Sequence, residues 1–244
     1  MRKLAFLELS HIFANQVKLP YSTGCIWSYC RTLDDISNNF SFDLHDWFYV
    51  LDGEFDVSVT AKRLAECDVV GVSYFVWNTF ISDKVCAEIK KINPDCLIVY
   101  GGLGTPKYGR CSDFLKERPY VDIIVHNEGE IVFSNLLKAI IYGKDFSTVN
   151  GITTQTFSTP LESRIKDFPS MPSPYLDGLF DELDSIKTNT YNWESLIELE
   201  RGCPYTCTFC EVGDRHWTKV IKQDYEKMVA EINWVSKRKI EYLH

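Results

Sequence analysis

The chain has 244 residues, of which 45% are hydrophobic and 25% are charged. These values are typical of a globular protein and exclude disordered, collagen-like and low-complexity classes. The formal net charge of −8 gives the chain no global electrostatic attraction to nucleic acid or to an anionic membrane. It contains no run of about 18 uncharged apolar residues, so no membrane-spanning helix is predicted.

The first 13 residues combine two basic residues with a short apolar stretch that carries Glu8. No small-residue cleavage site follows, so we interpret this segment as a buried strand and not as a signal peptide. The nine cysteines are an odd number, which argues against a disulfide framework and favours a reduced, cytoplasmic protein. Six of them are scattered and are expected to fill the core: Cys25, Cys30, Cys67, Cys86, Cys96 and Cys111.

Strands and helices are predicted to alternate over residues 1–145. Short apolar or alternating runs predict strands at 3–9, 40–47, 68–75, 96–102 and 121–126. Amphipathic segments predict helices at 21–33, 57–67, 80–92, 110–117 and 130–143. Five βα units imply a flavodoxin- or Rossmann-like α/β fold, a doubly wound parallel sheet with helices on both faces. The more polar second strand belongs at an edge, which favours the strand order 2-1-3-4-5.

Ligands of such sheets bind beyond the carboxyl ends of the strands. The segments expected at that edge are 10–20, 73–78, 101–105 and 126–130.

The rest of the chain has a different pattern. Residues 146–193 contain three closely spaced prolines and are interpreted as an ordered linker, with one further strand at 151–157. A second domain is expected over 194–244, with a strand at 194–202, a helix at 223–238 and a strand at 239–244. This β-loop-α-β pattern is only the first part of a parallel barrel, which needs roughly 200 residues.

The helix predicted at 223–238 is amphipathic. One face carries the apolar residues Tyr225, Met228, Val229, Ile232 and Val235. We expect that face to be buried and the charged face to be solvated surface, not a nucleic-acid site. The charged residues are Lys227, Glu231, Lys237 and Arg238.

Three cysteines differ from the others in their spacing. Cys203, Cys207 and Cys210 form a C-x3-C-x2-C loop within eight residues. Three thiolates this close can share one metal centre, and iron–sulfur clusters are held by cysteines in such runs. Zinc usually requires four ligands, and His216 is the only local candidate for the fourth. The pattern therefore favours an iron–sulfur site, with zinc or a purely structural role as alternatives.

The segment RGCPYTCTFC (201–210) resembles the cluster loop of the radical S-adenosylmethionine (SAM) enzymes. The resemblance implies that Cys203, Cys207 and Cys210 each ligate one iron of a [4Fe–4S] cluster. It implies that the fourth iron binds SAM, and that Phe209 lies near the adenine. A reduced cluster would then cleave SAM to methionine and a 5′-deoxyadenosyl radical, with the protein binding, orienting and shielding the reactants. An electron donor such as a flavodoxin or a ferredoxin is also implied.

Residues 1–143 resemble the cobalamin-binding domain that precedes the radical domain in one large subgroup of this family. The segments that carry the resemblance are 19–24, 71–78, 93–95, 101–102, 127–130 and, in the linker, 172–178. The resemblance implies cobalamin contacts from Pro20, Tyr21, Ser73, Trp77, Asn78, Gly101, Gly102, Glu128, Gly129 and Glu130. Simpler roles stay open for these residue types, as turn glycines, helix caps or acidic groups at a helix start.

The chain departs from the subgroup in two places. The loop at 10–15 lacks the D-x-H-x-x-G pattern that supplies a histidine to cobalt, so His11 is not assigned as a ligand. Cobalamin is therefore expected without a protein histidine ligand. Asn127 also stands where glycine is usual before the Glu-Gly-Glu segment.

Three functions follow from these observations. The first is a cobalamin-dependent radical SAM enzyme, with methyl transfer to an unactivated carbon as the commonest reaction of the subgroup and rearrangement or cyclisation as others. The second is a non-catalytic fragment that binds cobalamin or a cluster, and the third is a zinc-bearing interaction protein. The expected partners are an unknown small-molecule substrate, an electron donor and a chain that completes the barrel, with no nucleic acid and no membrane.

Overall fold

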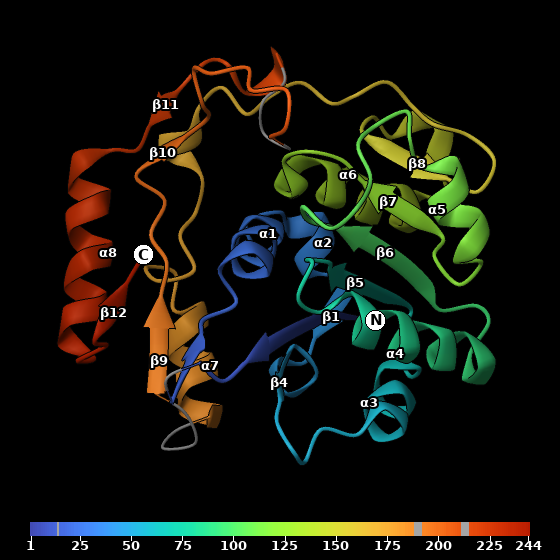
Figure 1. Ribbon diagram of the computed structural model, residues 1–244, viewed down its shortest axis with the longest axis horizontal. Coiled ribbons are helices and arrows are strands. Elements are labelled where there is room, and N and C mark those ends of the chain that lie inside the picture. The colour runs from blue at the N-terminus through green and yellow to red at the C-terminus, as the bar shows by residue number, and fades with distance from the viewer. Residues whose placement is uncertain (14, 188–191, 211–214) are drawn as a thin grey trace.

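The computed structural model describes residues 1–13, 15–187, 192–210 and 215–244. Its centre is a seven-stranded sheet in the order β3-β1-β5-β6-β7-β8, with β4 also paired to β1 (Figure 1). All its neighbours are parallel except β7 and β8. The strands are β1 (Arg2–His11), β3 (Phe40–Phe42), β4 (Phe48–Leu51), β5 (Val69–Ser73), β6 (Leu97–Gly101), β7 (Ile123–Val125) and β8 (Ile152–Thr154). The predicted order 2-1-3-4-5 is confirmed, with β8 added in antiparallel orientation.

Only the first three residues of the strand predicted at 40–47 form a strand, β3, and a second strand, β4, begins after the predicted end. A 3-10 turn, η1 (Leu44–Asp46), separates β3 from β4. The Asp43 side chain accepts a hydrogen bond of 2.8 Å from the backbone N–H of His45, which favours the turn over an extended chain. As a result, β3 pairs with the start of β1 and β4 pairs with its end.

Helices cover both faces of the sheet, as the doubly wound fold predicts. One face carries α1 (Tyr21–Arg31), α2 (Asp34–Ser37) and α6 (Gly129–Tyr142). The other carries α3 (Val57–Leu64), α4 (Thr79–Ile92) and α5 (Ser112–Glu117). Each layer buries its own apolar cluster against the sheet, which explains why every residue of the central strand β5 is buried. No helix within the described ranges is long and apolar enough to cross a membrane.

The segment expected to be a linker packs into the larger of the two cores. It contains β8, the 3-10 turns η2 (Phe146–Thr148) and η3 (Phe168–Ser170), and α7 (Leu179–Lys187). Tyr175 and Phe180 are at most 1% exposed and belong to the same apolar cluster as Trp27 of α1 and Trp47, which directly precedes β4. The boundaries at 145 and 193 therefore stay predictions, because the core continues across both.

A second, three-stranded parallel sheet has the order β12-β9-β2. It joins β9 (Asn192–Ser195) and β12 (Tyr242–Leu243) to β2 (Gln16–Lys18), which directly follows β1 in the chain. Beside it, β10 (Glu200–Arg201) pairs antiparallel with β11 (Ile221–Lys222), after the 3-10 turn η4 (Arg215–Trp217). The prediction of one continuous strand at 194–202 is therefore wrong, because β9 ends at Ser195 and the next strand turns to pair with β11.

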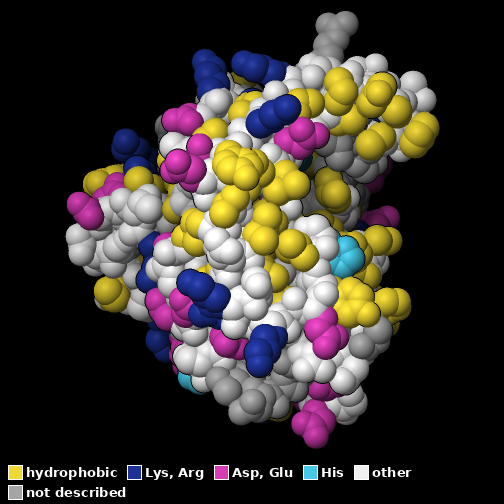
Figure 2. Space-filling model, turned by 90° about the vertical axis from the view of Figure 1, so that its left-hand side faces the viewer, with side chains coloured by type: hydrophobic (Ala, Val, Ile, Leu, Met, Phe, Trp, Pro, Cys, Tyr) yellow, Lys and Arg dark blue, Asp and Glu magenta, His cyan; other side chains and the backbone are white. Residues whose placement is uncertain are grey.

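The face predicted to be buried on helix α8 (Tyr225–Lys237) is only partly buried. Val235 points inward as predicted, together with Glu231 and Trp234, whereas Tyr225 is 74% exposed. The inward face meets polar partners, since Lys227 donates to the carbonyls of Pro169 and Met171. Figure 2 shows apolar side chains gathered on the side of the molecule where α8 lies. The exposed apolar residues of α8 and β12 are Tyr225, Val229, Ile232, Tyr242 and Leu243.

Candidate functional site

A cavity of about 950 Å³ lies at the carboxyl ends of β5, β6 and β7. Its walls include residues 100–103 and 125–130 from the sheet edge and 196–201 from the segment that follows β9. Tyr21 and the next turns of α1 close another side. Three of the four segments expected at the ligand edge therefore contribute to one cavity. The described part of the 10–20 segment lines none of it and instead supplies β2 to the second sheet.

Seven of the ten residues predicted to contact cobalamin line this cavity. They are Tyr21, Ser73, Gly101, Gly102, Glu128, Gly129 and Glu130. Pro20, Trp77 and Asn78 do not line it. The fold thus brings seven predicted residues, up to 109 positions apart in the sequence, to one cavity wall. The other three predicted residues lie outside that wall.

The three residues outside the wall have local roles. Asn78 is buried and holds the turn after β5, since its Oδ1 accepts from the Phe75 N–H (2.9 Å) and its Nδ2 donates to the Ser73 carbonyl (2.8 Å). Trp77 is 56% exposed and stacks on the Phe75 ring at 4.6 Å. Pro20 is the residue before α1, and its carbonyl accepts from the N–H of Gly24.

Two glycines at the end of β6 give the cavity a bare backbone wall. A Cβ at Gly101 would meet no atom within 4 Å, so the space in front of it is open. Gly102 has φ +107°, and a Cβ there would lie 2.8 Å from the Tyr74 carbonyl oxygen. The turn therefore requires glycine at 102, and the missing side chains leave room for a large ligand to approach the backbone.

The cavity suits a large organic cofactor. Its volume is at the upper end of the range for ligand sites. Ser73 and Tyr21 add polar side chains to a lining that is otherwise largely apolar and bare backbone on this side. These residues fit a flat ring system with polar side groups, which is the chemistry of a corrinoid.

A buried carboxyl group lies behind the cavity wall. Glu8, on β1, accepts a hydrogen bond of 2.9 Å from the hydroxyl of Thr23, a cavity residue. The Thr23 hydroxyl in turn accepts from the indole N–H of Trp47 at 2.9 Å. Burial raises the pKa of Glu8 to about 7, and the nearby hydroxyls of Ser73 and Thr23 offset only part of that rise.

Two histidines line the cavity, and both have protein partners. The Nε2 atom of His126 lies 2.8 Å from the Thr153 hydroxyl, and burial lowers the pKa of His126 to about 4. This imidazole is therefore neutral at physiological pH. The Nε2 atom of His244 lies 2.5 Å from Glu194. His11 lies outside the cavity, with its Nε2 atom 3.0 Å from the Trp77 carbonyl.

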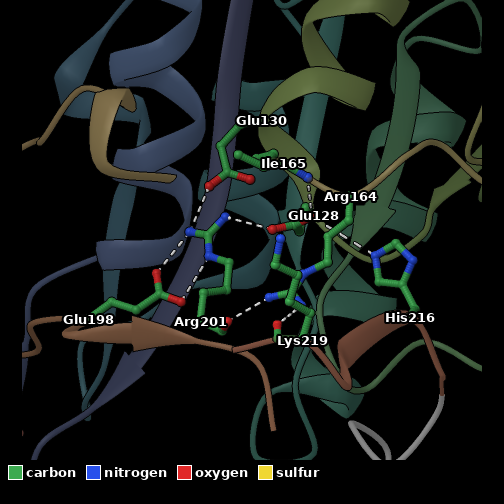
Figure 3. Close-up of polar contacts among 8 residues, drawn as sticks. All are labelled: Glu128, Glu130, Arg164, Ile165, Glu198, Arg201, His216 and Lys219. Atoms are coloured by element: carbon green, nitrogen blue, oxygen red, sulfur yellow. Dashed lines mark hydrogen bonds and ion pairs between the residues drawn. The ribbon is translucent and has the colours of Figure 1, made fainter. Parts of the chain in front are cut away.

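The cavity wall contains an ion-pair network centred on Arg201 (Figure 3). The guanidinium contacts Glu128 at 3.2 Å and Glu130 at 3.0 Å, both at the start of α6. It also makes two hydrogen bonds to Glu198, of 2.9 and 2.8 Å. Burial by itself lowers the pKa of Arg201, but the carboxylates of Glu198 and Glu130 outweigh it and raise that pKa above its usual value.

The cysteine loop begins at this network. Gly202 has φ +120°, and a Cβ there would lie 2.5 Å from the Lys219 carbonyl oxygen. The N–H of Cys203 donates to the Trp217 carbonyl at 2.8 Å, and Trp217 lines the cavity. At the other end of the loop, Lys107 of the cavity wall donates to the Cys210 carbonyl at 3.0 Å. The loop and the cavity are therefore neighbours.

The three loop cysteines are free thiols. Cys207 is exposed, and Cys203 and Cys210 are half-buried. Within the described ranges, no three His, Cys, Asp or Glu side chains lie close enough to hold a metal ion, so the three sulfurs do not converge. The donor set nevertheless fits an iron–sulfur cluster, which takes cysteine thiolates. His216, the candidate fourth ligand for zinc, lies 3.9 Å from Glu128. Phe209 is 89% exposed.

The sequence did not predict the role of Arg201 or Glu198 in the wall. Both precede the cysteines in the chain, and Arg201 belongs to the quoted loop motif, but nothing local indicates that it reaches Glu128, 73 residues earlier. The only signal in the sequence is that Arg201 closely follows two acidic residues, Glu198 and Glu200.

Comparisons with known proteins agree with the fold and the site. No family model matches the chain. It is 30% identical over 231 residues to "Cobalamin-dependent radical SAM methyltransferase TokK" of Streptomyces tokunonensis, covering 92% of this chain and 33% of that protein. It is 30% identical over 248 residues to a 2-(S-pantetheinyl)-carbapenam-3-carboxylate methyltransferase of Streptantibioticus cattleyicolor, covering 99% and 35%.

A solved structure shows the same fold. It is the cobalamin-dependent SAM radical enzyme OxsB with aqua-cobalamin bound, with a TM-score of 0.68 at 17% identity over 97% of this chain and 32% of that one. The fold and the cavity thus define a doubly wound α/β domain of the cobalamin-binding type, followed by the start of a second parallel sheet. The chain is a homologue of the cobalamin-dependent radical SAM methyltransferases over most of its length, and it spans about a third of the length of these curated relatives.

Proposed function

We propose that the chain provides the cobalamin-binding domain and the cluster loop of a cobalamin-dependent radical SAM enzyme. The observation that carries this proposal is the cavity at the carboxyl ends of β5 to β7, whose wall shares Arg201 with the cysteine loop. We assign cobalamin binding to residues 1–145, a connecting role to 146–193, and the start of the radical SAM domain to 194–244.

In this proposal, cobalamin occupies the cavity without a protein histidine ligand. The glycine wall at 101–102 leaves space for the corrin ring, and Tyr21, Ser73 and Gly129 line the same space. Glu128 and Glu130 act mainly through Arg201, because the carboxylates of both are paired with its guanidinium. Asn78 bonds to the backbone of the cavity residue Ser73, Pro20 precedes α1, and Trp77 stacks on the cavity residue Phe75.

Cys203, Cys207 and Cys210 are the residues that would hold a [4Fe–4S] cluster, and Phe209 is the candidate contact for SAM. When bound and reduced, such a cluster supplies the electron that cleaves SAM to a 5′-deoxyadenosyl radical. The protein's share is to place the loop beside the cavity, through the Cys203–Trp217 and Lys107–Cys210 backbone contacts. A flavodoxin or a ferredoxin is the proposed electron donor, and nine free cysteines suit a reducing cytoplasm.

Methyl transfer to an unactivated carbon of a small molecule is the proposed reaction, because the two relatives above are named as methyltransferases. A further chain segment is proposed to complete the barrel. The exposed apolar residues of α8 and the edge strand β12 provide the surface for it, since helices and parallel strands in a barrel are covered on both sides. The alternative is that the chain binds cobalamin or a cluster and has no catalytic activity.

Electron paramagnetic resonance distinguishes these functions. The protein is reconstituted anaerobically with iron and sulfide, reduced with dithionite and measured with and without SAM. A [4Fe–4S]⁺ signal that shifts when SAM is added supports the enzyme. A signal that does not respond to SAM indicates the non-catalytic alternative, and stoichiometric zinc without a cluster contradicts the proposal.

A further inference from the structure

Arg201 connects two parts of the chain that are far apart in sequence. Its side chain leaves β10, two residues before the first loop cysteine, and reaches the first turn of α6 on the main sheet. There it contacts Glu128 and Glu130, and the Phe168 ring lies under the guanidinium at 4.4 Å. The side chain is only 10% exposed.

The guanidinium uses its planar fork to satisfy all three carboxylates. Nε and one terminal nitrogen bind the two oxygens of Glu198, and that nitrogen also contacts Glu130. The other terminal nitrogen donates to Glu128. Such charge-assisted, buried pairs fix direction as well as distance. A lysine could not serve the three partners together, because its ammonium is a single point of charge.

The backbone around Arg201 carries this constraint into the loop. The Arg201 carbonyl accepts a hydrogen bond of 2.6 Å from Arg164, and Arg164 also donates to the Lys219 carbonyl. Gly202 follows in a conformation that other residues rarely adopt. The N–H of Cys203 then bonds to Trp217. Only Gly202 separates Arg201 from Cys203 in the chain. A fixed Arg201 side chain and backbone therefore restrict where the Cys203 sulfur can lie.

We propose that Arg201 is a positioning residue. Its ion pairs with Glu128 and Glu130 hold the first loop cysteine, Cys203, at the rim of the cavity. The role of Cys203 as a cluster ligand rests on the proposed function, but the positioning itself is a property of the chain without any cofactor.

Alkylation of the cluster-free protein tests this directly. Iodoacetamide is added under native conditions, and modification of each cysteine is followed over time by peptide mass spectrometry. In Arg201→Met, we expect the rate at Cys203 to rise about tenfold, because the loss of charge-assisted bonds makes local opening easier. Cys207 is already exposed and Cys86 is fully buried on α4, so their rates should stay unchanged.

The three cysteines separate positioning from general destabilisation. A merely structural role of Arg201 would raise the rate at Cys86 together with that at Cys203, and this outcome overturns the proposal. An unchanged Cys203 rate overturns it as well. Arg201→Lys should give an intermediate Cys203 rate, and Arg31→Met, which removes an ion pair with Glu182 outside the cavity lining, should behave as the wild type.

Glu128→Gln tests the same contact from the other side. If Arg201→Met does not fold, this variant alone carries the test, since it removes the partner charge 73 residues away and should also raise the Cys203 rate. In the double variant, the two effects should be less than additive. These rates require neither iron nor SAM. Failure of the wild type to form a cluster would therefore contradict the proposed function. It would not affect the positioning proposal, which the alkylation rates test by themselves.

Discussion

Glu8 accepts a 2.9 Å hydrogen bond from Thr23, so a buried carboxyl on β1 contacts a residue of the cavity wall. The pKa of this carboxyl is raised to about 7 by burial. In the unfolded chain, the group has its ordinary pKa near 4.5. Between these two values, the folded state keeps a proton that the unfolded state has lost.

This difference predicts that Glu8 makes stability fall as the pH rises from about 4.5 to about 7. The neutral variant Glu8→Gln should lack that loss and be more stable than the wild type at pH 8, by about 1–3 kcal/mol, because the ionised carboxylate is unfavourable in its buried site. Urea unfolding at several pH values measures this difference. Glu66→Gln, at an exposed ion pair with Lys3, is the control and should follow the wild type. Parallel pH curves for Glu8→Gln and the wild type would contradict the prediction.

The two adjacent glycines of the cavity wall separate ligand binding from folding. Gly101→Ala should leave unfolding unchanged, because its Cβ enters open space, but it should weaken cyanocobalamin binding about tenfold by adding a methyl group to the wall. Gly102→Ala should destabilise the fold by about 1–3 kcal/mol, since its φ is positive and its Cβ approaches the Tyr74 carbonyl.

Titration of the corrinoid absorption spectrum and thermal unfolding check these two effects. Gly53→Ala also enters open space but lies outside the cavity, so it should change neither quantity. Equal cyanocobalamin affinities for Gly101→Ala and Gly53→Ala would show that the cavity is not the corrinoid site.

The sequence predicted the main sheet because its signals are local. The apolar run at 68–75 and the glycines at 101–102 show strands and their ends directly, and parallel strands bring those ends to one edge. The pairing of β2 with β9 could not be predicted in this way, because three residues carry too little pattern. The contact of Arg201 with Glu128 likewise depends on how two distant segments pack.

The orientation of α8 shows a second limit. Its amphipathic pattern correctly indicates an apolar face, with Tyr225, Val229 and Ile232 at helical spacing. Periodicity does not reveal which face is covered within a given chain. Here Trp234 packs inward because its indole N–H donates to Asp181 of α7, and Lys227 turns to the same side because it donates to the Met171 carbonyl.

The cysteine loop predicts a specific dependence of iron content on three positions. After anaerobic reconstitution, the wild type should hold about four irons per chain, and Cys203→Ala, Cys207→Ala and Cys210→Ala should each lose most of them. The double and triple variants should be no worse than the single ones, because the ligands act as a unit. Cys86→Ala is the control, since this buried cysteine lies on α4 and should retain the iron at a modest cost in stability. Full iron content in all three loop variants would show that the loop is not the cluster site.

The contact of Trp234 with α7 predicts that α8 unfolds together with the main sheet. The indole N–H donates to Asp181 at 3.0 Å, and the ring packs on Tyr175 at 5.0 Å, within the core that also contains Trp27. Trp234→Ala should therefore cost about 3–5 kcal/mol, and Trp234→Phe less, because it keeps the ring packing and loses only the hydrogen bond. Tyr225→Ala, on the exposed face of the same helix, should change stability by no more than about 0.5 kcal/mol.

Urea unfolding followed by both tryptophan fluorescence and circular dichroism measures these effects. Coincident curves are expected, because one apolar cluster spans the segments on both sides of residues 145 and 193. If the curves separate into two transitions, and Trp234→Ala shifts only one of them, α8 belongs to an independently folding unit and the shared core does not couple it to the sheet.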